Sequence, residues 1–203
     1  MSDSVPILPW HGQMRQQHEE MGFPDGRGLP ARTSSRRSAS RTDMPAFTEG
    51  GCDCGRVRYR LHSGPIVVHC CHCRWCQRET GSAFALNAVI ETDQVELLGQ
   101  APDRIDTPSA SGRGQAIFRC PHCRIALWSH YAGAGEKAAF IRVGTLDNPD
   151  ACPPDVHIFT CSKLPWVVLP EGPARFENFY SGKDVARIYG KDGAARWKAL
   201  RGG

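Results

Sequence analysis

The sequence predicts a single all-β domain, and three observations indicate this fold class. At 203 residues the chain is long enough for one ordinary domain with tails, and too short for two full domains. From residue 51 onward, apolar runs of four to seven residues, rich in β-branched and aromatic side chains, recur between Gly and Pro. No long amphipathic helix is indicated before residue 183.

The first expected strand, residues 56–61 (RVRYRL), alternates strictly between apolar and basic residues. Val57, Tyr59 and Leu61 share one face, which is typical of a half-buried strand. Further strands are expected at IVVHC (66–70), FALNAVI (84–90), VELLG (95–99), AIFRC (116–120), ALWSHY (126–131), AFIRVG (139–144), VHIFTC (156–161) and WVVL (166–169). A terminal helix is predicted over residues 183–200, although Gly190 and Gly193 lower the helix propensity of this segment.

Two tails are expected on either side of this domain. Residues 1–44 are rich in Gly, Pro, Ser and Arg and lack apolar periodicity, which predicts a disordered tail. Met44 stands where structured sequence begins, so translation is hypothesised to start there. The domain is then expected over residues 45–179, and residues 180–203 form a basic C-terminal tail with six Lys/Arg against two Asp/Glu.

Composition restricts the function classes. The net charge of +4 resides in the C-terminal tail, so the expected core has no basic face that would favour nucleic acid. The sequence contains no run of about 18 apolar residues, so no membrane-spanning helix is predicted. The N-terminus lacks the apolar block of a secretory signal, which predicts a cytoplasmic location. In that reducing compartment the ten cysteines indicate metal binding rather than disulfides.

The cysteines with metal-ligand spacing form three groups: Cys52/Cys54, Cys71/Cys73/Cys76 and Cys120/Cys123. In extended backbone, residues i and i+2 face the same side, and a C-x-x-C turn directs two thiolates to one point, so the two outer pairs could form a closed tetrahedral Zn²⁺ site. The middle group would then hold a second ion with one position open to water or substrate. The spacing equally allows Cys73 and Cys76 to join Cys120 and Cys123 in one site.

Five segments, in order over residues 51–169, resemble motifs of the glutathione-dependent formaldehyde-activating enzyme family, which includes centromere protein V. They are GGCDCGRVRY, CHCRWCQRETGS, FRCPHC, VGTLDNP and PPDVHIFTCSKLPW. The resemblance implies a β-tent-like fold of small zinc-stapled sheets. It also implies two zinc ions, a structural one on Cys52, Cys54, Cys120 and Cys123 and a catalytic one on Cys71, Cys73 and Cys76.

The sequence departs from the family pattern at two places. Arg124 and Ile125 follow Cys123, where the family often has Gly-Thr, so this zinc knuckle is expected to turn differently. Cys70 is an additional cysteine, either an alternative ligand or a small buried residue.

Three thiolates would leave a bound Zn²⁺ with a formal site charge near −1, which makes it a poor Lewis acid but suits a fourth thiolate. The resemblance implies that this ligand is glutathione, which adds to formaldehyde as in S-(hydroxymethyl)glutathione synthase, a carbon–sulfur lyase. Arg74 and Arg78 flank Cys76 and are predicted to bind glutathione carboxylates, with solvated loop arginines as the alternative. The alternative function is a non-catalytic, zinc-stabilised binding module.

Three other side chains near these motifs have two interpretations each. Trp75 either covers the metal site or packs in the core. His72 is expected to contact a sulfur or face solvent rather than bind metal, and His157 is expected to be structural rather than functional.

Overall fold

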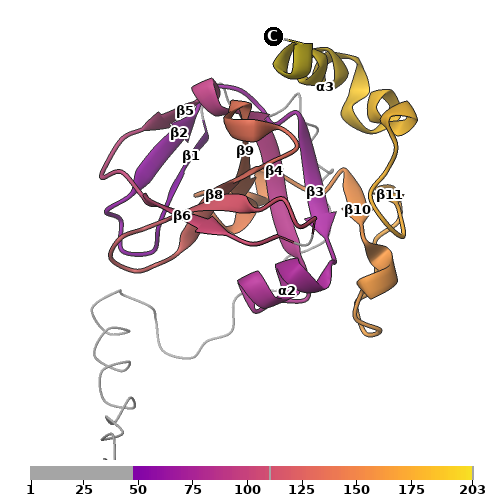
Figure 1. Cartoon of the computed structure of the whole chain (residues 1–203), viewed down its shortest axis with the longest axis horizontal. Coiled ribbons are helices and arrows are strands. Elements are labelled where there is room, and N and C mark those ends of the chain that lie inside the picture. The colour runs from indigo at the N-terminus through magenta and orange to yellow at the C-terminus, as the bar shows by residue number, and fades with distance from the viewer. Residues whose placement is uncertain (1–47, 110, 203) are drawn as a thin grey trace, which may run out of the picture. The chain divides into compact units, whose positions relative to one another are not determined.

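The computed structural model describes residues 48–109 and 111–202 and confirms the all-β class (Figure 1). The strands in these ranges form a three-stranded sheet of order β1-β2-β5 and an eight-stranded sheet of order β11-β10-β3-β4-β9-β8-β7-β6. Neighbours pair antiparallel, except that β10 is parallel to both β3 and β11. The tail predicted at residues 1–44 and the start at Met44 lie outside the described residues.

The bounds of the elements are as follows. The small sheet contains β1 (Thr48–Gly51), β2 (Arg58–Leu61) and β5 (Val95–Leu97). The large sheet contains β3 (Val67–Cys71), β4 (Ala85–Glu91), β6 (Asp103–Thr107), β7 (Gln115–Arg119), β8 (Ala126–Tyr131), β9 (Ala138–Arg142), β10 (Val156–Ile158) and β11 (Ala174–Arg175). The α-helices are α2 (Arg74–Thr80) and α3 (Val185–Gly202), and the 3₁₀ turns are η2 (Thr92–Gln94), η3 (Gly135–Lys137), η4 (Val143–Thr145), η5 (Pro149–Ala151), η6 (Thr160–Ser162) and η7 (Gly182–Asp184).

Most of the predicted runs form strands, but the prediction for WVVL was wrong. Residues 166–169 form no strand, and Val168 is 89% exposed. The Nζ of Lys163 donates to the carbonyls of Leu164 and Val167, at 3.1 and 2.8 Å, which holds this segment in a turn. The sequence reading missed β1, β6, β11 and α2 because these elements are short or carry little apolar periodicity.

The first hydrophobic cluster fills the space between the two sheets. Val57, Tyr59 and Leu61 are at most 1% exposed, which confirms the predicted buried face of the strand. They pack with residues of the large sheet such as Trp128 and Ile141. The Tyr59 and Trp128 rings meet edge to face at 5.8 Å, and the Tyr59 hydroxyl contacts Thr145 Oγ1 at 2.7 Å. The small sheet thus covers one face of the large sheet.

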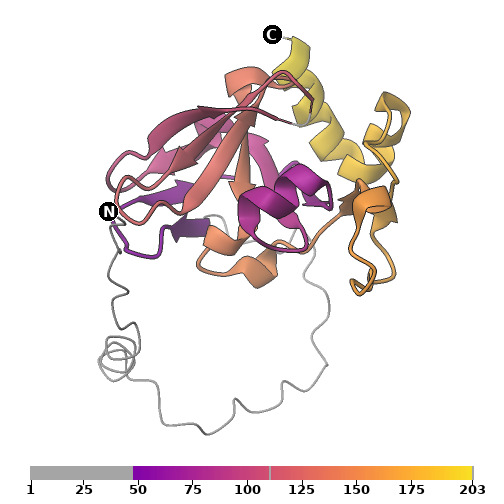
Figure 2. The same ribbon diagram turned by 60° about the horizontal axis from the view of Figure 1, so that its bottom comes forward.

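The second cluster lies on the opposite face of the large sheet, where α3 packs (Figure 2). Val67 and Val89 are direct partners on β3 and β4 and belong to this cluster, together with Ile188 and Tyr189 of α3. Their neighbours Val68 and Ala88 belong to the first cluster, as the two-residue period of a strand requires. The central strands are therefore buried on both faces.

Helix α3 confirms the predicted terminal helix and its weak point. At Gly190 the backbone adopts φ 71° and ψ 177°, which breaks the helix into two segments, a conformation that glycine tolerates. None of the helices in the described ranges has both the length and the apolarity to cross a membrane.

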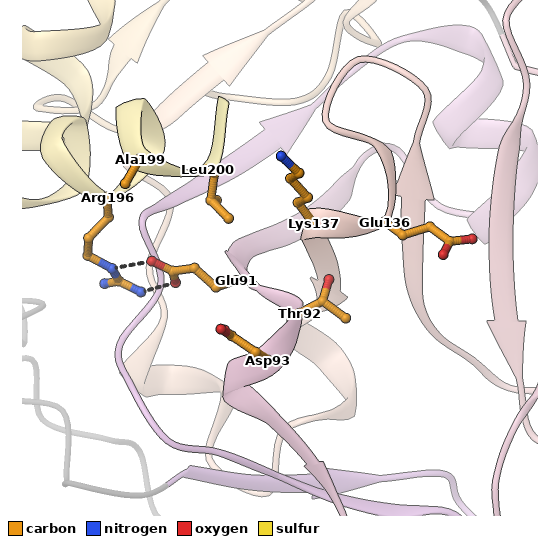
Figure 3. A pocket seen from close by; sticks show the side chains of 8 residues that line it. All are labelled: Glu91, Thr92, Asp93, Glu136, Lys137, Arg196, Ala199 and Leu200. Carbon is orange, nitrogen blue, oxygen red and sulfur yellow. Dashed lines mark hydrogen bonds and ion pairs between the residues drawn. The ribbon is translucent and has the colours of Figure 1, made fainter. Parts of the chain in front are cut away.

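An ion pair fixes the second segment of α3 to the large sheet (Figure 3). Arg196 Nε donates to Glu91 Oε1 at 2.8 Å, Nη2 pairs with the other oxygen, and Nη1 donates to the carbonyl of Gly64 at 2.9 Å. Glu91 and Arg196 also line a cavity of about 690 Å³, and its described lining includes no cysteine or histidine. This cavity marks the junction of helix and sheet and does not hold the predicted chemistry.

We expect Gly193→Ala to displace α3 from β3. A Cβ at residue 193 would stand 2.7 Å from the carbonyl oxygen of Ile66, a backbone atom that cannot move aside as the end of a flexible side chain can. Overpacking of this kind costs about 1–3 kcal/mol, measurable as a lower free energy of unfolding in urea. Gly144→Ala is the matched control because no atom lies within 4 Å of its Cβ position. Equal stability of the two variants would contradict this account.

Candidate functional site

Four cysteines from two distant turns meet at one point. Cys52 and Cys54 follow β1, and Cys120 and Cys123 lie in the turn between β7 and β8. All four Sγ atoms lie within 4.8 Å of one another, with 3.4 Å between Cys52 and Cys54 and 3.6 Å between Cys54 and Cys120. Tetrahedral Zn²⁺ with Zn–S bonds near 2.3 Å requires sulfurs about 3.8 Å apart. The four-cysteine group therefore fits such an ion.

The backbone brings Cys52 and Cys54 together in a different way from the one expected. They lie in a turn, closed by a hydrogen bond from Gly55 N to the Cys52 carbonyl at 3.1 Å, and not in extended backbone. The amide of Val57 also donates to Cys52 Sγ at 3.3 Å. Burial raises the pKa of Cys52, but this amide and the neighbouring thiols outweigh it and lower the pKa. The turn therefore favours a thiolate.

The second turn also corrects an expectation. Arg124 has φ 62°, the left-handed conformation that glycine adopts readily, and its amide donates to the Cys120 carbonyl at 3.1 Å. The zinc knuckle therefore has the backbone conformation that glycine adopts readily, although the residue at this position is arginine. Arg124 Nη1 pairs with Asp103 on β6 at 2.8 Å, which holds the side chain to the neighbouring strand.

The second cysteine group has three members and forms where β3 ends and α2 begins. Cys71 ends β3, Cys73 is the N-cap of α2, and Cys76 lies in its first turn. Their Sγ atoms lie within 4.8 Å of one another. Cys73 and Cys76 thus group with Cys71 and not with Cys120 and Cys123. The short helix that the sequence reading missed provides the C-x-x-C spacing.

The thiols of this group are not equivalent. Hydrogen bonds from the Cys71 and Cys76 thiols, and from the Cys76 amide at 3.4 Å, lower the pKa of Cys73 despite its partial burial. A hydrogen bond with Cys71 lowers the pKa of Cys76, but the hydrogen bond with Cys73, burial and the charge of Cys73 outweigh it and raise this pKa to about 12. The contacts of this corner therefore favour a thiolate at Cys73.

A cavity of about 570 Å³ opens onto the three-cysteine group. Cys71, Cys73 and Cys76 are the cysteines that line it, so the four-cysteine group faces elsewhere. Part of the wall comes from the C-terminal segment and includes Tyr189 and Trp197 of α3. Part of the cavity wall is therefore formed by residues that were predicted to belong to the C-terminal tail.

A buried arginine next to this group was not predicted. Arg142 on β9 is 7% exposed, and its guanidinium donates to Asn87 Oδ1 at 2.6 Å and to Ser129 Oγ at 3.4 Å. It forms no ion pair with a carboxylate in the described part of the chain, and its charge opposes the rise of the Cys76 pKa. Negative sulfurs would compensate this buried cation. An arginine inside the apolar run AFIRVG was the sequence signal for it.

The predicted glutathione contacts Arg74 and Arg78 lie on α2. Both are exposed, and Arg74 donates to Gln77 Oε1. Neither lines the cavity, where the guanidinium groups come from Arg113 and Arg201, so glutathione binding by Arg74 and Arg78 stays a prediction. Trp75 does line the cavity, as expected if it covers the site.

A third cluster lies behind the cavity and contains Cys70, His72 and His157. All three are at most 3% exposed, so His72 does not face solvent. Its Nε2 lies 3.5 Å from Cys70 Sγ, as the expected sulfur contact requires, and 3.0 Å from His157 Nδ1. Burial lowers the pKa of both rings. The cluster could hold a metal, and it also accounts for Cys70 as a buried residue.

Comparisons with known proteins agree with these motifs. A protein of Halomonas elongata, named "Putative glutathione-dependent formaldehyde-activating enzyme", is 28% identical over 127 residues, which is 60% of this chain and 80% of that protein. A crystal structure of a Rhodobacter sphaeroides protein aligns with a TM-score of 0.38 and 19% identity over 49% of this chain and 87% of that one, too low a score to support any argument. Residues 47–162 match the family described as "Glutathione-dependent formaldehyde-activating enzyme", and the chain belongs to this family.

Proposed function

We propose that the protein is a zinc-dependent carbon–sulfur lyase that joins a thiol, such as glutathione, to an aldehyde such as formaldehyde. One observation carries this proposal: the three-cysteine group, which is one ligand short of a tetrahedral site, opens onto a cavity. The family is an enzyme family named for this chemistry. A closed four-cysteine group elsewhere in the domain leaves this open group free for substrate.

The donor sets fit two zinc ions with different roles. Cys52, Cys54, Cys120 and Cys123 would complete a structural site, and Cys71, Cys73 and Cys76 would leave one position open. A zinc ion there would hold an incoming thiol as its thiolate near neutral pH. The protein supplies the remaining conditions: Arg142 offsets the negative charge of the sulfurs, and the cavity walls hold the thiol in place.

The proposed reaction is an addition across a carbonyl. The thiol proton leaves to solvent, and the sulfur electron pair attacks the aldehyde carbon. A C–S bond forms while the C=O π bond breaks, and its oxygen takes a proton. With formaldehyde the product is a hemithioacetal, the S-hydroxymethyl derivative of the thiol. Positioning the two reactants accounts for the acceleration, because such orientation replaces a bimolecular encounter.

We expect Cys73→Ser to abolish this reaction while the domain stays folded. Adduct formation from formaldehyde with either glutathione or benzyl mercaptan should be measured by NMR for the zinc-loaded protein and the variant. Loss of one thiolate from the open group should lower the rate at least about 100-fold, as for removal of an electrostatic catalytic group. A wild-type rate no higher than background with both thiols would overturn the proposed function.

Cys120→Ser should have the opposite phenotype, loss of the fold. A structural Zn²⁺ site supplies on the order of 10–16 kcal/mol of apparent binding energy in small zinc domains, which exceeds most domain stabilities. Circular dichroism should show lost thermal cooperativity, and a chelator should produce the same change in the wild type. A folded, zinc-depleted Cys120→Ser protein would exclude a structural role for this group.

Arg142→Met should weaken metal retention by the three-cysteine group alone. The charge of Arg142 acts on Cys76, and a unit charge at about 4 Å is worth about 1 kcal/mol in water and about 4 kcal/mol at an effective dielectric constant of about 20. Without this charge, chelators should remove the ion at least about tenfold more readily. Ser129→Ala, which removes one partner but keeps the charge, is the control. Zinc release from the four-cysteine group in the same titration is an internal reference. Unchanged release from both groups would contradict a role for this charge.

A further inference from the structure

The residues that line the cavity beside the three-cysteine group indicate which class of thiol fits it. This inference rests on the proposed function, because it assumes that a thiol sulfur enters the open group. The cavity volume of about 570 Å³ lies within the range of small-molecule sites, about 300–1,000 Å³. The cavity is therefore of a size that suits a small molecule, and its lining residues indicate the class of substrate.

Eight of the 25 described residues of the wall are Phe, Tyr or Trp. Trp75, Tyr131, Phe140, Phe179, Tyr189 and Trp197 all line the cavity. Such rings favour flat apolar groups through edge and stacking contacts, which add about 0.5–1.5 kcal/mol each beyond the burial of area. An aromatic body on the substrate would match this surface.

Some polar atoms of the wall already have hydrogen-bond partners, whereas the buried Nε1 of Trp75 has none in the described part of the chain. The hydroxyl of Tyr180 contacts His69 Nε2 at 2.7 Å and the hydroxyl of Tyr189 at 2.6 Å. Asn87 Oδ1 accepts from the buried Arg142. A peptide ligand entering this cavity would lose water from its amides without gaining these partners, which is costly.

Apart from the three cysteines, the charged side chains of the described wall are arginines. Arg113 and Arg201 line the cavity, and no Asp or Glu is among the described residues of its wall. The Arg113 Nη2 atom lies near Gly133, 3.6 Å from where a Cβ would stand, and the charge of Arg201 acts on Tyr189. Neither guanidinium pairs with a carboxylate in the part of the chain described. A carboxylate fits these guanidinium groups, whereas the ammonium group of glutathione finds no carboxylate among the described residues of the wall.

Part of the wall lies outside the residues that match the family. Phe179, Tyr189, Trp197 and Arg201 lie beyond residue 162, where the match to the family ends. The family's name therefore gives no information about what this wall selects.

We propose that the thiol taken by this site is an arylalkyl thiol with a single carboxylate, with its sulfur at Cys71, Cys73 and Cys76, its ring against the aromatic wall, and its carboxylate at Arg113 or Arg201. Addition to the aldehyde then follows the balanced step given above. Glutathione, with two carboxylates, an ammonium group and two amides, is the poorer ligand.

Binding can be measured without turnover in protein whose zinc is replaced by cobalt(II), since a thiolate entering the open group changes the cobalt absorption spectrum. The probes are 4-(mercaptomethyl)benzoate, benzyl mercaptan and glutathione. We expect the carboxylated aryl thiol to bind at least about tenfold more tightly than glutathione, since ring contacts are gained and no ammonium is left unpaired. Equal or tighter binding of glutathione overturns this proposal and leaves the proposed function intact.

The charged end is tested by the double variant Arg113→Gln/Arg201→Gln. It should weaken 4-(mercaptomethyl)benzoate about tenfold, the value of one lost charge-assisted hydrogen bond, and leave benzyl mercaptan within about twofold. Lys191→Gln/Lys198→Gln, with the same charge change at exposed positions of α3 outside the cavity, is the control. Equal weakening of both aryl thiols, or of neither, overturns the carboxylate contact. If no thiol changes the spectrum of the wild type, the proposed function fails together with this inference.

Discussion

The convergence of Cys52, Cys54, Cys120 and Cys123 is the constraint on which the rest of the structure depends. These residues belong to turns that leave β1 and connect β7 to β8, so the cluster joins the small sheet to the large one. Four thiol groups this close together have only weak partners in each other, whereas a shared cation would make them a cross-link. The first hydrophobic cluster, with Tyr59 against Trp128, packs between the two sheets that this cysteine group joins.

The second group of sulfurs depends on a different local device. At the end of β3 the chain leaves the sheet and begins α2, with Cys73 as the N-cap, so Cys71, Cys73 and Cys76 converge within six residues. Gln77 ties this corner to the rest of the domain, because its Nε2 donates to the carbonyls of His72 and Ser162 at 2.7 and 2.9 Å. The corner is rigid on one side and faces the cavity on the other. Rigid ligands beside open space are the arrangement that a substrate-binding metal site requires.

The charge balance links this corner to the body of the sheet. Arg142 is buried on β9 and held by Asn87 of β4, its register partner. A buried guanidinium without a carboxylate is expensive unless another negative group lies near it. Thiolates in the three-cysteine group, as proposed above, would meet that need, and the charge of Arg142 acts on Cys76. The sheet and this corner would then be electrostatically coupled as well as packed together.

The sequence by itself determined the local features of this protein. Strict alternation in RVRYRL, the cysteine spacings and the ordered family motifs were enough for the all-β class and for the three-cysteine and four-cysteine groups, because each depends on residues close in the chain or on a family pattern. Only the tertiary structure decided what surrounds the open group. The rings of α3 reach the cavity because α3 packs on β3, and His72 meets His157 across 85 residues of sequence. Contacts of this kind follow from sheet order and helix docking, which no spacing along the chain records.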